Sequence, residues 1–398
     1  MRYSSTGEDV VQKMKLADML SYADISHLNN IASYYDCDCK RNSKHELIQS
    51  ILIKAGRKEF LKEQWKSFSP GDLRFLNNLV FDTRSSYSLE DLLAAVRHTS
   101  LEEKSDETPG SKPARTALES PREAVSRYRR SGWLFNGFTS STKYMFHVPE
   151  DLKERFREEL SLHLKSGLQV SMPPEVYREE QGLITEDLKL MLRYFQEHEL
   201  TLNAEGFMYR KQQQQLLSTL HIEESLITKG PWRFGYGRSC SEYPDRFALL
   251  YDYAVAQRWV QETPAGLTLT EHGKECILSG NQVSMIQLFR FWLKIYKSAV
   301  PNLPSLVYWL GRCAKEWVTM DSLHATVGSL VTPFYYDTPR MILERRIVKM
   351  LLHLGMLRLG ESQTLGTVIR MTPLGIKAGE IAPQLGHGTV HNDNDVII

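Results

Sequence analysis

Two short segments in the second half of the chain share one pattern. They read LTEHGK at 269–274 and MTPLGIK at 371–377, about a hundred residues apart. In each, a hydrophobic residue ends a predicted hairpin, the threonine can cap a following helix, and the glycine lets that helix pack closely against a sheet. This recurrence indicates an internal structural repeat, which is the strongest organisational signal in the chain.

The segments before these closures have a common order of predicted elements, in which helices are followed by a two-stranded hairpin. That order is typical of a winged helix, and it occurs three times. The first copy has a helix at 121–131 and apolar-aromatic runs at 133–138 and 143–148. The second copy has helices from Thr185, at 211–220 and at 243–257, an extended piece at 200–202, and strands at 259–261 and 267–269. The third copy has a helix at 339–353 and strands at 354–359 and 368–371.

The N-terminal region, residues 9–54, is predicted to form three short helices. Ser43 can cap the third of them, and Glu46 stands three residues later, where it completes a capping box. The pattern LADML…LNNIASYY…KHELIQSIL in this region resembles the small helix-extended-helix domains of the SAP and Rho-N-terminal type. Such domains often touch nucleic acid.

The whole chain is therefore expected to be mainly α with small β-hairpins (α+β), an N-terminal helical domain followed by tandem winged-helix domains. The apolar, aromatic-rich stretch 281–317 is interpreted as helical core. The expected domains are 1–54, a SAP/Rho-N-like helical domain; 55–165, a first winged-helix-like domain with a polar loop at 100–113; 166–280, a second winged-helix domain; 281–385, a helical block plus a third winged-helix domain; and 386–398, a tail that looks like the truncated start of a further domain.

Composition narrows the class of protein. The 398 residues carry 49 basic and 48 acidic side chains, a net charge of +1, so a nucleic-acid interface must come from local patches. Five cysteines in a long chain fit a reducing compartment better than a disulfide scaffold. There is no signal-peptide pattern and no apolar run of about 20 residues for a membrane span. A cytoplasmic protein that does not bind membranes is expected.

Motifs for catalysis are missing from the sequence. It has no phosphate-binding glycine loop followed by Lys-Ser or Lys-Thr, no G-x-S-x-G and no H-E-x-x-H. Cys37 and Cys39, flanked by His27 and His45, could ligate zinc, but a second cysteine pair is lacking, and reduced loop cysteines are the simpler interpretation. The acids at 150–151 faintly echo a nuclease signature but lie at a helix start, where they complement the helix dipole. We expect no enzyme activity, no cofactor and no bound metal.

Three local features favour nucleic-acid binding. Between residues 112 and 165, eleven Lys and Arg stand against seven Asp and Glu, a net charge of +4. A second basic group opens a helix in what is interpreted as a recognition position, where cations hold phosphates and glutamines can read base edges. For each group the alternative to nucleic-acid binding is a structural role: the side chains lie on a solvated helix face, stabilise the dipole at a helix C-terminus or form local ion pairs. The candidate contacts of the first group are Arg127, Arg129, Arg130 and Lys143, and those of the second group are Arg210, Lys211 and Gln212. The third group lies on the helix at 339–353, and its candidate contacts are Arg345 and Arg346.

Residues from about 121 to 398 are similar to bacterial helicase-associated proteins with an XPB-like N-terminal region. The likeness rests on residues 183–195 followed by LTLNAEGFMYRK, on the closure LTLTEHGKECI, and on the tail GTVHNDNDVII. In that family the tail is followed by a strand-rich domain, so the resemblance implies an N-terminal portion of a longer protein or a shortened relative. It also implies an accessory piece without an ATPase, associated with helicases or DNA repair.

Two functions remain open at this stage. The first is a non-catalytic accessory factor that binds the phosphates of duplex or forked DNA through tandem winged helices, with little sequence preference and a steep dependence on salt. The second is a protein-interaction scaffold that docks onto a polymerase, a helicase or another partner. An exposed apolar patch on the block 281–317 would favour the scaffold.

Overall fold

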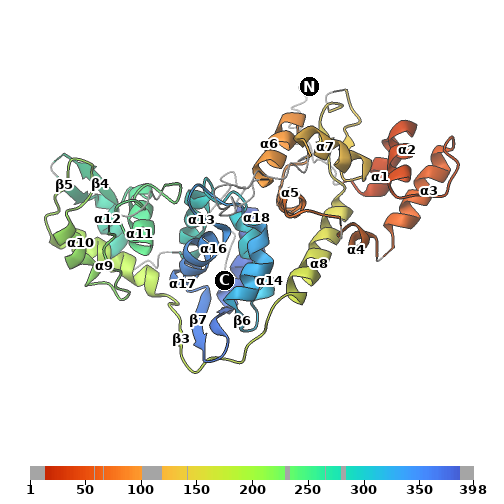
Figure 1. Cartoon of the computed structure of the whole chain (residues 1–398). Helices are drawn as coiled ribbons and strands as arrows, with labels where there is room; N and C mark the ends of the chain where they lie inside the picture. Colours follow the sequence, from red (N-terminus) through yellow and green to blue (C-terminus); the bar gives the residue numbers. More distant parts are fainter. Residues whose placement is uncertain are drawn as a thin grey trace, which may run out of the picture. The chain divides into compact units, whose positions relative to one another are not determined.

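The computed structural model describes residues 14–57, 59–65, 67–100, 119–140, 142–228, 234–264, 266–278 and 284–385. These residues are mainly helical with small antiparallel sheets (Figure 1), which confirms the expected α+β class. The chain divides into two compact units, residues 1–163 and 164–398, and each is described by itself. The expected loop 100–113, apart from Ser100, and the expected tail 386–398 lie outside the described residues.

Unit 1 begins with the three predicted helices, which pack through Leu20, Leu28 and Leu47, all fully buried. The Ser43 hydroxyl caps the third helix by accepting from the Glu46 amide at 3.3 Å. The predicted capping box is only half formed, because the Glu46 carboxylate accepts from the Lys40 amide instead. The helices and strands of this part of the chain are α1 (Leu16–Tyr22), α2 (Ile25–Tyr34), α3 (Lys44–Ala55), α4 (Phe60–Trp65), α5 (Pro70–Phe81), α6 (Leu89–Thr99), α7 (Pro121–Arg130), β1 (Phe135–Asn136), β2 (Phe146–His147) and α8 (Glu150–Ser166), which continues into unit 2.

Unit 2 contains two hairpins, β4–β5 and β7–β8. The second hairpin belongs to a four-stranded sheet of order β3-β7-β8-β6, although the sequence predicted a hairpin alone. The two added strands have two residues each, too short to show a strand period. The elements are β3 (Tyr177–Arg178), α9 (Leu183–Glu197), α10 (Arg210–Leu217), α11 (Asp245–Ala256), β4 (Val260–Thr263), β5 (Gly266–Leu269), α12 (Glu271–Leu278), α13 (Met285–Tyr296), α14 (Leu303–Cys313), β6 (Val318–Thr319), α15 (Met320–Thr326), the 3₁₀ turn η1 (Val327–Leu330), α16 (Pro339–Met341), the π-helical segment η2 (Ile342–Val348), α17 (Lys349–His353), β7 (Leu357–Ser362), β8 (Gly366–Met371) and α18 (Pro373–Leu385).

One arrangement recurs three times along the described residues. A helix, a short extended segment, two further helices and a hairpin follow one another, and the extended segment pairs antiparallel with the second strand of the hairpin. The three pairings are Tyr87 with Phe146, Leu200 with Leu267, and Val318 with Ile369. We call these groups of elements modules 1, 2 and 3: α5, α6, α7 and β1–β2; α9, α10, α11 and β4–β5; and α14, α15, the segment α16–η2–α17 and β7–β8.

The turn from the third helix into the hairpin is also the same in every module. The amide that enters the hairpin donates to a carbonyl five residues back, at 2.8–3.0 Å. The residue before it has a left-handed backbone, with φ of 73° at Gly132, 58° at Arg258 and 66° at Gly355. This is the hydrogen-bonding pattern of a Schellman turn, in which glycine is the usual left-handed residue.

The two closures share the local geometry that the sequence pattern predicts. The hydroxyl of Thr270 accepts from the Gly273 amide, and the hydroxyl of Thr372 accepts from the Gly375 amide, both at 3.1 Å. A Cβ added to Gly273 would lie 2.3 Å from the Trp259 carbonyl oxygen, so only glycine fits. The equivalent separation at Gly375 is 1.9 Å. Glycine therefore lets each helix approach the backbone at the start of its hairpin.

The described part of the stretch 281–317 forms α13 and α14 with short non-helical segments after each, and most of its aromatic side chains form core as predicted, while Phe291 and Tyr308 are half-buried. Trp292 and Trp309 are fully buried, and Phe289 packs against Trp292 with ring centroids 5.8 Å apart. Within the described ranges, no helix has both the length and the apolarity needed to cross a bilayer.

Candidate nucleic-acid interface

The structure separates the nine candidate residues into three places. Arg127, Arg129, Arg130 and Lys143 lie on α7 and the β1–β2 hairpin of module 1, in unit 1. The other five lie in unit 2, on α10 of module 2 and on η2 of module 3. Their exposure and their partners differ from place to place.

Helix α7 is fixed at both ends by local signals. Ser120 and Glu123 form a complete capping box, with Pro121 in the first turn. At the other end, Gly132 adopts the left-handed conformation that turns the chain into β1. The last turn of the helix carries three arginines, which favour a helix C-terminus because its dipole is negative there.

Arg127 is the arginine of this turn that anchors the helix. Its guanidinium lies 2.6 Å from a carboxylate oxygen of Asp72 on α5, and 2.8 Å from one of Glu119. Burial opposes ionisation of Asp72, but hydrogen bonds from Tyr128 and Arg127 outweigh it and hold the pKa of that carboxyl below its usual value. The Arg127 guanidinium is therefore occupied by ion pairs within the protein, one of which connects α7 to α5.

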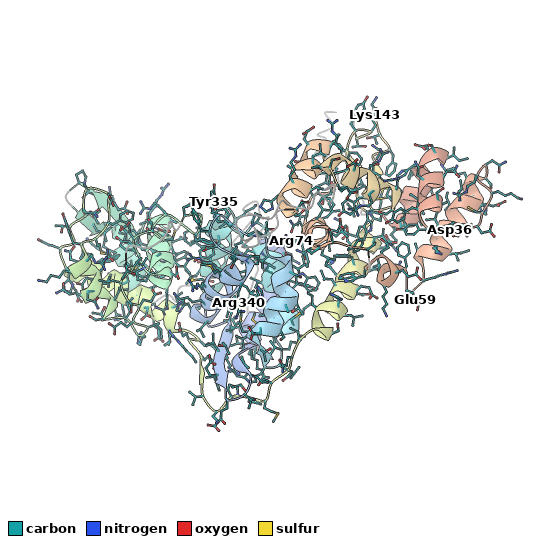
Figure 2. The ribbon with its side chains drawn as sticks, viewed as in Figure 1. Asp36, Glu59, Arg74, Lys143, Tyr335 and Arg340 are labelled. Carbon is teal, nitrogen blue, oxygen red and sulfur yellow. The ribbon has the colours of Figure 1, made fainter. Side chains whose placement is uncertain are left out.

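Arg129 and Arg130 end α7, Lys143 lies between β1 and β2, and all three side chains are exposed. The Arg129 guanidinium donates to the Asn136 side-chain oxygen at 3.0 Å, and the Asn136 amide donates to the Lys143 carbonyl at 3.1 Å. Figure 2 shows the Lys143 side chain extending outward from the hairpin. The structure thus joins the end of α7 to the hairpin in one cationic surface. We call Arg129, Arg130 and Lys143 the hairpin cations.

The candidate residues of module 2 lie on α10, which is not the helix that leads into the hairpin. Arg210 donates to the Ile227 carbonyl at 3.0 Å, Gln212 donates to the Glu199 carbonyl at 3.3 Å, and Lys211 is exposed. The helix before the hairpin is α11, and every residue from 245 to 254 is buried. The sequence assigned the recognition position to the helix at 211–220, but the helix that directly precedes the hairpin in this module is α11, and its side chains are enclosed in unit 2.

Arg346 in module 3 is also enclosed. Its side chain has a 9% exposed fraction and lies 3.1 Å from Asp245 and 3.2 Å from Asp337. The guanidinium carbon is 4.4 Å from the centroid of the Tyr236 ring. These contacts satisfy the charge inside the protein, so this geometry does not favour a phosphate contact. Arg345, one residue earlier, is exposed.

Sequence reasoning missed a buried group of charged side chains in unit 2. Arg246 on α11 hydrogen-bonds to Asp187 on α9, and its Nε lies 3.7 Å from Glu180. The Nδ1 of His353 lies 2.8 Å from the same Glu180. All four side chains are at most 3% exposed. The signal in the sequence was a charged pair, Asp245 and Arg246, at the start of a helix whose other residues, apart from Asp252, are apolar or aromatic.

A shallow groove of about 530 Å³ lies along β3 and the β7–β8 turn. Met172, Val176 and Tyr177 line it with exposed fractions of 83%, 80% and 47%. In the part of the chain that the structure describes, no group of three or more His, Cys, Asp or Glu side chains could hold a metal ion. Cys37 is buried, and the Cys39 thiol contacts the Cys37 carbonyl.

No family model, curated protein or solved structure matches the chain.

Proposed function

We propose that this chain is a non-catalytic, DNA-associated accessory protein whose three modules are winged helices, and that module 1 binds DNA phosphates through the hairpin cations. The observation that carries the proposal is the exposure of Arg129, Arg130 and Lys143 together on the third helix and hairpin of one module. A link to a helicase or a repair complex, which rests on the sequence resemblance, belongs to the same proposal.

The recurring arrangement supports the winged-helix assignment. A winged helix has the order helix, strand, helix, helix and hairpin, and its third helix enters a DNA groove while the hairpin contacts the backbone. Each module has this order, and its first extended segment pairs with the second hairpin strand. In module 1 the two elements that would meet DNA, α7 and β1–β2, are those that carry the hairpin cations.

The hairpin cations are suited to phosphates rather than to base edges. They lie at the C-terminal end of α7 and on the hairpin, whereas base readout by a recognition helix uses its N-terminal residues. A few phosphate contacts give weak, sequence-independent binding whose logarithm falls linearly with log salt, with a slope of about −0.9 for each phosphate on duplex DNA. Three cations predict a slope of about −3.

The test is fluorescence anisotropy of a labelled duplex against the full chain across a salt series. We expect the triple variant R129E/R130E/K143E to lose binding about tenfold or more at low salt and to flatten the salt slope. The matched control is the double variant R210E/K211E in module 2, which we expect to bind almost as the parent does. Equal affinity of the triple variant and the parent would contradict the proposal.

A second candidate function, a protein-interaction scaffold, is favoured by the groove along β3. Soluble monomers rarely expose large apolar patches. Met172, Val176 and Tyr177 are all exposed, and all three line this groove. The block 281–317 no longer supports this function, because its large aromatic residues Trp292, Tyr296 and Trp309 are buried. Loss of partner binding in M172D/V176D, with DNA binding unchanged, would identify the groove as the docking site.

A further inference from the structure

Three aromatic side chains are exposed at the β1–β2 hairpin of module 1. Tyr144 follows the tip of the hairpin and is 75% exposed, while Phe138 precedes the tip and is 37% exposed. Tyr22, at the end of α1, is 64% exposed and contacts Phe138 with ring centroids 4.6 Å apart. Phe138 also stacks on His147, with an interplanar angle of 19°. Large rings usually lie in a core or an interface, so three exposed rings on and beside this hairpin indicate a surface that binds a ligand.

The most exposed of these rings stands next to a hairpin cation. The Lys143 ammonium lies 4.8 Å from the centroid of the Tyr144 ring. The Arg129 guanidinium lies 5.8 Å from the centroid of Phe146, a buried ring in the second strand of the same hairpin. Proteins that bind single-stranded nucleic acid combine these two features, since cations follow the backbone while aromatic faces stack on unpaired bases. Within a duplex the base faces are covered by neighbouring base pairs. An exposed ring can therefore reach a base only where the strands are apart.

Thr139 and Thr142, on the two sides of the hairpin, hydrogen-bond to each other. The amide of Thr139 donates to the Thr142 hydroxyl, the amide of Thr142 donates to the Thr139 hydroxyl, both at 3.2 Å, and the two hydroxyls are 2.7 Å apart. A Cβ on Gly137 would lie 2.3 Å from the Thr142 carbonyl oxygen, so glycine is required there. These contacts fix the two residues next to Phe138 and Lys143.

We propose that Tyr144 stacks on an unpaired base, so that module 1 recognises the junction at which duplex DNA opens into single strands. This inference rests on the proposed function and names its substrate class. The hairpin cations hold the backbone phosphates beside the junction, and the Tyr144 ring covers the face of the first exposed base. Phe138 and Tyr22 offer a second aromatic surface on the same hairpin.

The experiment compares a forked DNA with a blunt duplex of equal phosphate number, using fluorescence anisotropy and the full chain. One stacked base contributes about 1–3 kcal/mol, so the parent should bind the fork about 5- to 150-fold more tightly than the blunt duplex. Y144A should lose this preference and keep its affinity for the blunt duplex. Y144F should keep the preference, because its ring remains. The matched control is Y335A in unit 2, where the exposed fraction of Tyr335 is 74%.

A second measurement needs no variant. A fork with 2-aminopurine at its first unpaired position should change its fluorescence when the parent binds, because stacking on a ring quenches that base. A fork preference that is absent in the parent or survives in Y144A, or a 2-aminopurine signal that does not move, overturns the stacking proposal. If R129E/R130E/K143E still weakens binding in that case, phosphate binding by module 1 stands. Failure of the parent to bind either DNA at low salt overturns both.

Discussion

Helices α7 and α11 occupy the same place in modules 1 and 2, yet their surroundings are opposite. Helix α7 exposes Arg122, Ser126, Arg129 and Arg130 along one side. Helix α11 is buried from residue 245 to 254 and packs against α13, α17 and β4. The third helix of this arrangement is thus exposed to solvent along one side in module 1 and is buried within unit 2 in module 2. A shared fold does not by itself assign a shared function to the two helices.

The comparison extends to single arginines. Arg129 is exposed and donates to one neutral side chain, Asn136. Arg246 is 1% exposed and lies among carboxylates, with Asp187 and Glu180 both fully buried beside it. A guanidinium that stays in water pays no desolvation free energy, whereas the desolvation of a buried guanidinium must be offset by charged or polar partners with good geometry. The first is available to a ligand, and the second is a part of the core.

The largest expected effect comes from removing the buried arginine. R246L leaves the carboxylates of Asp187 and Glu180 without their buried cation, and we expect a loss of about 3–5 kcal/mol in the free energy of unfolding of unit 2. Urea unfolding followed by tryptophan fluorescence measures the loss, and hydrogen exchange assigns it to unit 2. The matched control R129L should change stability by no more than about 0.5 kcal/mol. Similar losses for both variants would contradict the difference between the two helices.

Much of the repeat could be predicted from local sequence. The closures at Thr270 and Thr372 were predictable because a cap and a close-packing glycine act within four residues. Most helices were predictable because their apolar spacing is regular. The pairing of Tyr87 with Phe146 was not, because a bridge of one residue leaves no period. The two-residue strands β3 and β6 escaped for the same reason.

The candidate site was predictable only in part. The basic residues around α7 and Lys143 stand out in the sequence, and the structure connects Arg129 to Lys143 through Asn136, with Arg130 next to Arg129 at the end of α7. The enclosure of Arg346 was not predictable, because its partner Asp245 lies 101 residues away. Charged side chains are usually exposed, and the burial of Asp245 and Arg246 on α11 depends on tertiary contacts. The exposure of Tyr144 depends likewise on what packs against the hairpin.

A smaller effect is expected at the carboxylate that anchors α7. Hydrogen bonds from Tyr128 and Arg127 keep the pKa of Asp72 below the ordinary value of 3.8 despite burial. Its contribution to stability is therefore complete above pH 3.8 and is lost as the pH falls through the lower, folded-state pKa. D72N should lower the stability of unit 1 by about 1.5–3 kcal/mol at neutral pH and make its acid unfolding less steep. Urea unfolding at several pH values tests this. An unchanged acid limb would show that Asp72 is not the anchor.

The smallest effect concerns the turn that the modules share. Arg258 holds the left-handed position that glycine holds in modules 1 and 3, with φ of 58°. An L-residue with a side chain is strained there, so R258G should stabilise unit 2 by about 0.5–1 kcal/mol, because relief of strain exceeds the added flexibility of the unfolded chain.

The opposite change, G132A, should destabilise unit 1 by a similar amount. The nearest atom to its new Cβ would be a side-chain carbon of Ile31 at 3.7 Å, an ordinary contact, so backbone strain alone is measured. Thermal unfolding of both variants tests the pair. Shifts of the same sign would mean that the two turns are not equivalent and would remove one support for the proposed winged-helix repeat.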